Sequence, residues 1–336
     1  MTVQIAIIGT GQIGASIGLA LAEHKDMFFR VGHDKELRIA NRAKELGALD
    51  RVDMNLPNTV ADAQIVILAL PLDQIRDTLK YIAPDLKDEV VIMDTAPVKN
   101  EVLEWAREIL PPKRYYVGLT PVLNPAYLDT SDSGVEAAHA DLFKNGMMAI
   151  LSSQGVPAEA IKLATDFCHL LGAEHLFMDP VELDSIMAAT HILPQLIAAA
   201  LLRTTVDKPG WYEARKLAGR PYAAGTRAVS QFEEAKSLTN QAILTNEHLV
   251  RLMDALVESI HELREQLSSK DGEKLLQELI SAQLDREKWL KERYTANWAA
   301  SETNPPVELP TARDIFARMF TFGGGRKSKQ PPKLPK

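Results

Sequence analysis

Short apolar runs alternate with helical patterns over the first half of the chain. Seven runs have the length and apolar content of buried strands: Val3 to Ile8, Phe28 to Gly32, Ile65 to Leu70, Val90 to Met93, Tyr115 to Leu119, Met147 to Leu151 and His175 to Met178. Helical patterns lie between them, including one from Pro157 to Leu171. Because strands that alternate with helices pair in parallel under a cover of helices, we expect an α/β domain over residues 1–179.

The pattern changes after Pro180. Val181 to Val206 is apolar almost all round, and Arg227 to Trp298 is helical in pattern without strand-like alternation. We therefore expect an all-helical second domain over residues 180–300. A helix that is apolar on every face needs neighbours on every side, and a domain of this size finds them most readily in a second copy of itself. The pattern thus predicts a homodimer formed through the helical domain.

The most apolar long stretch, Ile186 to Leu202, approaches the length of a membrane span. It contains Thr190, His191, Pro194 and Gln195, which favour a buried helix instead. The N-terminus has no basic region, and its apolar run stops at Gly9, so neither a signal peptide nor a membrane span is expected.

The tail, residues 301–336, is rich in proline and then in glycine and basic residues, which predicts a largely disordered segment. Within it, residues 311–322 have apolar side chains at helical spacing and predict a short helix, docked on its own protein or used for a partner. The last 26 residues carry a charge of +6, which leaves −13 on the rest of the chain. An acidic body makes nucleic acid an unfavourable main partner.

Length and composition agree with a two-domain globular protein. The 336 residues are about twice a typical domain, and 46% apolar with 25% charged residues is ordinary for a folded protein. Cys168 is the single cysteine, and no Cys and His residues recur at ligand spacing. A disulfide within the chain is therefore excluded, no metal site is expected, and the composition favours the cytoplasm.

A glycine fingerprint follows the first predicted strand. It consists of Gly9, Thr10, Gly11, Gln12, Ile13 and Gly14. In a dinucleotide site the first glycine permits a tight turn, the second lets backbone approach the pyrophosphate, and the third lets helix and strand pack closely. Asp34, at the end of the second strand, is placed to accept hydrogen bonds from ribose hydroxyls. These features predict a Rossmann-type domain.

The acid at position 34 favours NAD over NADP, because a carboxylate repels the 2′-phosphate. Lys35 and Arg38 follow closely in sequence and would favour the phosphate if they turned inward. We therefore expect NAD as the cofactor, with NADP as the alternative.

Further segments stand in a distinctive order along the chain. They are Ala69-Leu-Pro71, Asp94-Thr-Ala-Pro-Val-Lys99, Val117-Gly-Leu-Thr-Pro-Val-Leu-Asn124, Met178-Asp-Pro-Val-Glu-Leu-Asp184, Ala188-Ala-Thr-His-Ile-Leu-Pro-Gln195, Gly225-Thr-Arg227 and Asn246. With the fingerprint and the helical second half, the chain resembles the prephenate and arogenate dehydrogenase family from about residue 3 to 298. The resemblance implies NAD(P)-dependent oxidation of the ring alcohol of prephenate or arogenate with loss of carbon dioxide. It also implies that Leu70, Pro71 and Thr95 border the cofactor, and that Arg227 holds a carboxylate of a small anionic substrate.

The chain departs from the family pattern at the reacting centre. The family's His-Pro-Met-x-Gly segment has Thr120 in place of its histidine, and its Asp-x-Gly-Ser-x-Lys turn has Pro97 in place of the serine. The family's Ser-His-Leu-Pro-His segment aligns on His191 to Gln195, which removes both histidines and puts one at the serine position. These departures put the identity of the catalytic groups in doubt.

Three residues are candidates for the role of the missing family histidine at the reacting hydroxyl. His191 could act as the base if its displacement by one residue, about 100° around a helix, still directs it to the substrate. Lys99 could act if burial lowers its pKa, and Thr120 could orient a hydroxyl without serving as a base. The alternatives are a hydrogen-bonded core histidine and a solvated lysine.

Two other positions stay open. Asn124 could hold a substrate carboxylate or carbonyl, or support the turn before Pro125. Asp184 fits best as a favourable charge near the start of its own helix.

Two further functions remain possible on this sequence. An enzyme of the same architecture could oxidise another small hydroxy or imino acid, although the helix from Val181 to Val206 offers no lysine to polarise such a substrate. A non-catalytic NAD-binding sensor would keep the nucleotide residues and lose the chemical ones.

Overall fold

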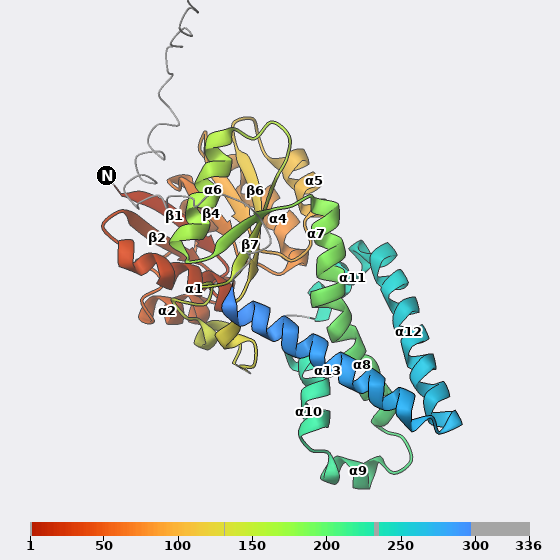
Figure 1. Cartoon of the computed structure of the whole chain (residues 1–336). Helices are drawn as coiled ribbons and strands as arrows, with labels where there is room; N and C mark the ends of the chain where they lie inside the picture. Colours follow the sequence, from red (N-terminus) through yellow and green to blue (C-terminus); the bar gives the residue numbers. More distant parts are fainter. Residues whose placement is uncertain (1, 131, 232–234, 297–336) are drawn as a thin grey trace, which may run out of the picture.

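The computed structural model describes residues 2–130, 132–231 and 235–296, which form a sheet domain followed by helices (Figure 1). The sheet has eight strands in the order β3-β2-β1-β4-β5-β6-β7-β8. Their bounds are β1 Val3–Ile8, β2 Phe28–His33, β3 Arg51–Val52, β4 Ile65–Leu68, β5 Val91–Asp94, β6 Tyr115–Val122, β7 Met147–Ser152 and β8 Glu174–Phe177. The predicted strands are all present, and the two-residue β3 is an addition.

The sheet is parallel, as expected for an α/β domain, except at one pair, where β7 runs antiparallel to β6. A parallel pair needs a long crossover, usually through an α-helix. The connection from β6 to β7 contains only the short turns η3 (Pro125–Tyr127) and η4 (Gly134–Ala137), so the chain returns in the opposite direction.

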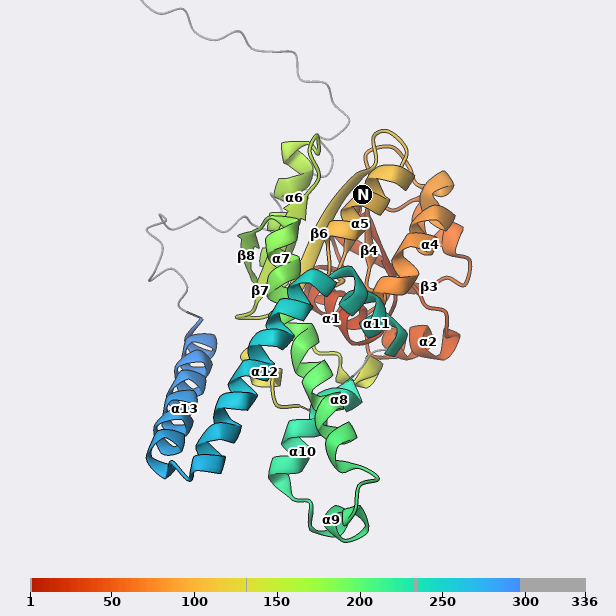
Figure 2. The ribbon, with the colours of Figure 1, turned by 90° about the vertical axis from the view of Figure 1, so that its right-hand side faces the viewer.

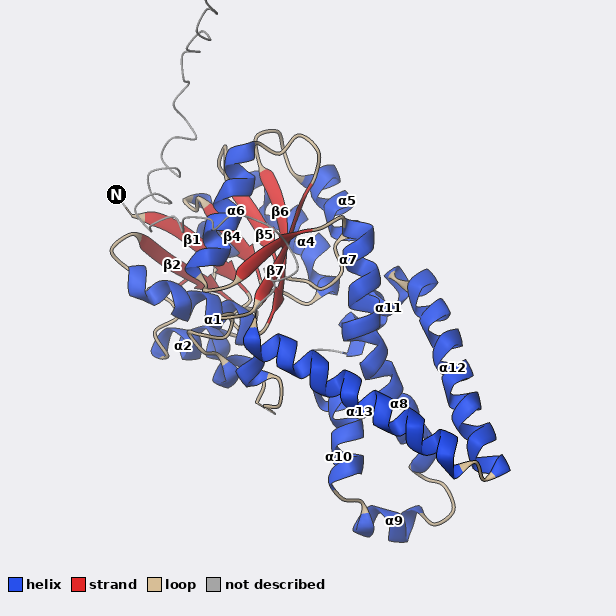
Figure 3. Ribbon diagram, in the orientation of Figure 1, coloured by secondary structure: helices blue, strands red, loops and turns tan. Residues whose placement is uncertain are grey.

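Helices cover both faces of the sheet, as Figure 3 shows. On one face, α1 (Gln12–Ala20), α2 (Leu37–Glu45) and α6 (Ala158–Leu170) pack against alternate strand residues such as Ile5 and Ile7. On the other face, α3 (Leu56–Ala61), α4 (Leu72–Ile82) and α5 (Asn100–Ile109) pack against Ala6 and Ile8. The period of two along β1 therefore feeds two separate cores.

The second half of the described chain is helical from Pro180 onward. Its elements are α7 Pro180–Met187, η5 Ala188–Ile192, α8 Leu193–Thr205, α9 Trp211–Leu217, α10 Arg220–Thr226, η6 Arg227–Gln231, α11 Ala235–Leu244, α12 Asn246–Ser269 and α13 Gly272–Thr295. Leu183, Ile192, Leu238 and Leu249 from this half join the core on the α4 and α5 side. The helices are thus attached to one face of the sheet domain.

The helix from Pro180 to Thr205 is long and apolar enough to cross a membrane by length and composition alone. Only 17% of its most apolar 18-residue window is buried, so the expectation of a buried helix is wrong for the single chain. Ala188 and Ile192 face the shared core, but α8 continues past the end of the sheet, where its contacts with α10, η6 and α12 leave Ile197 and Leu201 exposed.

The last two helices form a hairpin that stands away from the sheet domain (Figures 1 and 2). Helix α12 leads outward and α13 leads back, so that its far end contacts η3. Exposed apolar side chains run along both: Val250, Met253, Val257, Ile260 and Leu267 on α12, and Leu276, Leu279, Ile280, Leu284 and Trp289 on α13. We call this set the hairpin stripe. The predicted tail and its helix over residues 311–322 lie outside the described residues.

Candidate active site

The glycine fingerprint forms the turn between β1 and α1. Gly9 has a φ of +86°, and a Cβ there would lie 2.2 Å from the carbonyl oxygen of Ala69. A Cβ on Gly14 would lie 1.9 Å from the carbonyl oxygen of Gly9. Both positions therefore need glycine for the fold itself.

Gly11 is different, because a Cβ there would meet no heavy atom within 4 Å. Its φ of −68° and ψ of −159° are open to any residue, and it is the N-cap of α1 without a side-chain cap. The first N–H groups of a helix have no partner within the helix, so this start, with open space beside Gly11, suits an anionic pyrophosphate.

Asp34 follows β2 and is bonded to the fingerprint. Its Oδ2 accepts hydrogen bonds from the Thr10 amide at 2.8 Å and the Thr10 hydroxyl at 3.1 Å, and its Oδ1 accepts one from the Glu36 amide at 3.0 Å. The Arg38 side chain is 86% exposed and its guanidinium lies 3.9 Å from the Glu36 carboxylate. The acid is thus held beside the turn, while Arg38 points to solvent.

The other predicted cofactor residues follow adjacent strands of the sheet. Leu70 and Pro71 come directly after β4, and Thr95 comes directly after β5, with its amide bonded to the Leu68 carbonyl at 3.0 Å. Gln12 bonds the carbonyl oxygen of Ala137 through Nε2 at 3.1 Å, and Ile13 packs against the core. Since the carboxyl ends of parallel strands share one edge, these residues border one region.

A buried charged cluster lies at the end of β5. The Lys99 ammonium is fully buried, 2.6 Å from Asp94 Oδ2 and 3.1 Å from the Asp94 carbonyl oxygen. The hydroxyl of Tyr116 donates to Asp94 Oδ1. Burial lowers the pKa of Lys99 against the opposing effect of Asp94, and burial with the Asp94 charge raises the pKa of Tyr116. The interpretation of Lys99 as a solvated lysine is wrong.

Residues 95–98 form a loop whose two ends are joined by the ion pair of Asp94 and Lys99. Tyr116 was not predicted, because nothing in its strand distinguishes it from other inward-facing apolar positions. Its partner Asp94 sits on the neighbouring strand, so the contact depends on sheet order.

Asp184 connects the helices to this cluster. Its carboxylate accepts hydrogen bonds from the amides of Lys99 at 2.6 Å and Asn100 at 3.2 Å, at the start of α5. Burial raises its pKa, while these two hydrogen bonds oppose that effect. The interpretation as a charge near the start of its own helix is wrong, since Asp179 is the residue that caps α7.

Thr120 and Asn124 are both buried, on β6 and just after it. The Thr120 hydroxyl donates to the Ala96 carbonyl at 3.0 Å, which places it against the 95–98 loop. Asn124 accepts from the Ala126 amide at 3.1 Å and donates to the Asp141 carbonyl at 3.1 Å. Both polar atoms of the Asn124 side chain are thus bonded to the protein, the oxygen within the turn and the nitrogen to Asp141.

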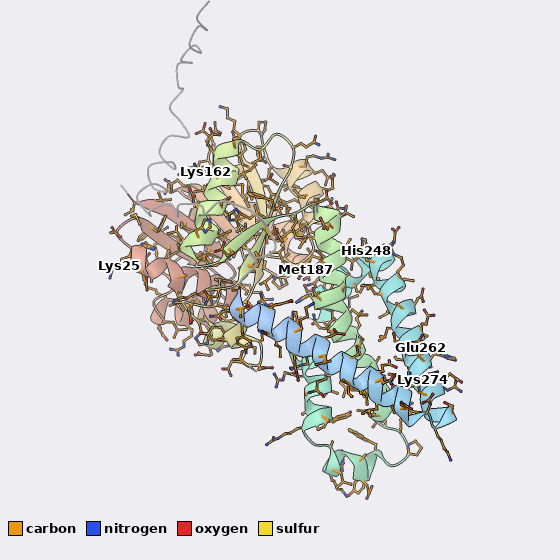
Figure 4. All side chains as sticks on the ribbon, in the orientation of Figure 1. Lys25, Lys162, Met187, His248, Glu262 and Lys274 are labelled. Atoms are coloured by element: carbon orange, nitrogen blue, oxygen red, sulfur yellow. The ribbon has the colours of Figure 1, made fainter. Side chains whose placement is uncertain are left out.

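His191 lies in η5, a π-helical turn in which the Leu193 amide bonds the Ala188 carbonyl. Pro194 lacks an amide hydrogen and its ring crowds the carbonyl four residues earlier, which favours such a wide turn here. The periodicity of a uniform α-helix therefore does not give the direction of His191. Figure 4 labels Met187, the last residue of α7, which directly precedes this π-helical turn.

The His191 side chain is exposed, and its ring has no hydrogen bond to any residue that the structure describes. The interpretation as a hydrogen-bonded core histidine is therefore wrong. Desolvation by the surrounding protein nevertheless lowers its pKa below the ordinary 6.5. Because its pKa is lowered, the imidazole is neutral near neutral pH, which is the form that a general base requires.

Arg227 opens η6 and reaches back to the sheet domain. Its Nη1 donates to the Asp129 carbonyl at 2.9 Å, in the connection that follows β6. Its other N–H groups bond no residue within the described ranges, and the guanidinium is partly exposed. It can therefore hold a carboxylate beside that connection.

The fold and site define a two-domain dinucleotide-binding oxidoreductase. Residues 17–176 match the family model described as prephenate dehydrogenase, nucleotide-binding domain, and residues 179–281 match prephenate dehydrogenase, dimerization domain. The chain belongs to the prephenate dehydrogenase family and is an NAD(P)-dependent enzyme of this type.

Relatives and solved structures agree with this assignment. The chain is 27% identical to cyclohexadienyl dehydrogenase from Zymomonas mobilis over 84% of this chain and 94% of the relative. It is 26% identical to prephenate dehydrogenase from Bacillus subtilis over 81% and 72%, respectively. The fold is similar to prephenate dehydrogenase from A. aeolicus in complex with hydroxyphenyl propionate and NAD+, with a TM-score of 0.75 and 20% identity over 86% of this chain and 98% of that chain.

The space at Gly11 makes a testable prediction. We expect Gly11→Ala to leave the melting temperature of the free protein unchanged, because its Cβ meets no protein atom. The affinity for NAD should fall by about tenfold or more, since the methyl group enters the space that backbone leaves for the pyrophosphate. Thermal unfolding and NAD titration measure the two effects. A variant with unchanged NAD affinity would place the pyrophosphate elsewhere.

Proposed function

We propose that this protein oxidises the ring alcohol of prephenate or arogenate with loss of carbon dioxide. NAD(P)+ supplies the acceptor for the hydride that leaves the alcohol carbon. The hydroxyl proton passes to a base, the bond to the ring carboxylate breaks, and its electron pair completes the aromatic ring. The observation that carries the proposal is Arg227, held by the connection after β6 with N–H groups left for a carboxylate.

We assign the base to His191. Thr120 cannot fill this role because a hydroxyl is far too weak a base. Its own proton is donated to the Ala96 carbonyl, and its oxygen keeps a lone pair that can accept a hydrogen bond from the substrate hydroxyl. Lys99 is fully buried with its ammonium on Asp94, so we assign it to positioning the 95–98 loop. Asn124 shapes the turn beside Arg227.

We propose NAD as the preferred cofactor. Asp34 is fixed beside the fingerprint by Thr10, where it can accept a ribose hydroxyl and repel a 2′-phosphate. The Arg38 side chain is 86% exposed and its guanidinium lies 3.9 Å from the Glu36 carboxylate, which offsets the positive charge that would favour a 2′-phosphate.

We propose a homodimer that covers the hairpin stripe, in the cytoplasm. The stripe residues on α12 recur at spacings of three and four, as in helices that pack along a seam. Exposed apolar side chains in such number are rare on a monomer. The match to a dimerization domain supports a second copy as the cover.

Turnover with the two acids tests the proposed reaction. We expect NAD reduction at 340 nm with prephenate or arogenate, and loss of at least about 100-fold in kcat/KM in Arg227→Ala, because a carboxylate loses its charge-assisted hydrogen bonds. The affinity for NAD should stay the same. Absence of turnover in the wild type, despite NAD binding, would move the function to another hydroxy or imino acid or to a sensor.

The assignment of His191 predicts a pH dependence. The base must be neutral, so kcat/KM should be constant above the pKa of His191 and fall as the pH drops through it, at a pH below 6.5 because that pKa is lowered. His191→Asn should reduce kcat by about 10²- to 10⁴-fold and remove this acid limb. A variant that keeps both the rate and the acid limb would exclude His191 as the base.

The dimer is tested at Val257, which is 65% exposed on α12. Val257→Glu should convert the protein to a monomer in sedimentation experiments, because a buried unpaired carboxylate is strongly unfavourable in an apolar interface. Glu258→Lys changes a charge at the next position of the same helix and should leave the dimer intact. A wild-type monomer at micromolar concentration would contradict the proposal.

A further inference from the structure

Helix α13 ends on the substrate side of the sheet domain. Its last turns lie beyond residue 281, where the match to the dimerization domain stops. Figures 1 and 2 show the helix returning from the hairpin tip toward the sheet domain, where it contacts η3. The end of α13 is therefore a feature of this chain outside the matched region.

Arg293 is the one buried residue among the 24 of α13, at 6% exposure. Its Nη2 donates to the Leu123 carbonyl oxygen at 2.7 Å. Burying a guanidinium is unfavourable unless hydrogen bonds compensate, so an arginine is a poor choice for packing alone at this position. The bond to Leu123 gives the residue a specific role on the connection after β6.

Two arginines from different helical elements hold the same connection by its carbonyl oxygens. Arg293 bonds Leu123 at one end of residues 123–129, and Arg227 bonds Asp129 at the other, at 2.9 Å. Between them Asn124 ties the turn to Asp141, and the Asn124 amide bonds the Leu142 carbonyl at 2.7 Å. We call residues 123–129 the substrate loop.

We propose that Arg293 is a positioning residue for substrate: it fixes the substrate loop at Leu123, so that Thr120 before the loop and Arg227 at its end keep their separation. This inference rests on the proposed function for the identity of the acid. Loss of the Arg293 bond frees the start of the loop without touching the fingerprint, so substrate binding weakens and cofactor binding does not.

The test compares Arg293→Met and Arg293→Lys in the full-length protein. The methionine variant keeps an apolar stem and removes the donor, and we expect its KM for prephenate or arogenate to rise about tenfold, the effect of about 1.4 kcal/mol. Its KM for NAD should stay within about twofold. The lysine variant keeps a donor and should recover part of the affinity. Arg286→Met, an exposed arginine on the same helix, is the matched control and should behave as wild type.

Hydrogen exchange of the substrate loop gives a second measurement that needs no turnover. Arg293→Met should speed exchange of the Asn124 amide region, and Arg286→Met should not. If the wild type oxidises neither acid, the proposed function fails, and exchange alone decides whether Arg293 anchors the loop. Unchanged exchange, or equal rises in KM for the acid and for NAD, would overturn the inference, as would a lowered melting temperature with both KM values unchanged.

Discussion

The buried pair of Asp94 and Lys99 is the interaction on which the site depends. Two opposite charges removed from water are stable only when hydrogen bonds satisfy both, and loss of one partner from such a pair typically costs about 3–5 kcal/mol. Tyr116 and the Ala96 amide complete the shell of Asp94. The same pair fixes the 95–98 loop, whose Ala96 carbonyl orients Thr120.

The two domains are joined through this cluster. Asp184 of α7 accepts the free amides at the start of α5, including that of Lys99 itself. A carboxylate at the start of a helix is favourable, because the amides there lack partners and the helix dipole is positive. The orientation of the helical domain is thus coupled to the loop that borders the cofactor region.

The residues proposed for the cofactor and those proposed for the substrate come largely from different halves of the chain. The sheet domain carries the glycine fingerprint and Asp34, and the helical half carries Arg227 and His191. Thr120, in place of the family histidine, has a hydroxyl oriented by the Ala96 carbonyl, and a hydroxyl is too weak a base to remove the substrate proton. His191, to which the proposed function assigns the base, lies on a π-helical turn of the helical half and is exposed to water.

The pattern of residues along the chain was enough to predict the local elements: strands, helices, the fingerprint turn and the change from α/β to all-α near residue 179. These follow from periodicity and from residues that act within a few positions of each other. The partners of Lys99, the hydrogen bonds of Asp184, the antiparallel β7 and the contact of Arg293 with Leu123 became visible only in the folded chain. Each of these joins residues far apart in the chain, or depends on strand order, and a single sequence carries no signal for such distances. His191 lies between these cases. The sequence indicated it as a candidate, but the direction of its side chain depends on a π-helical turn that the sequence pattern did not predict.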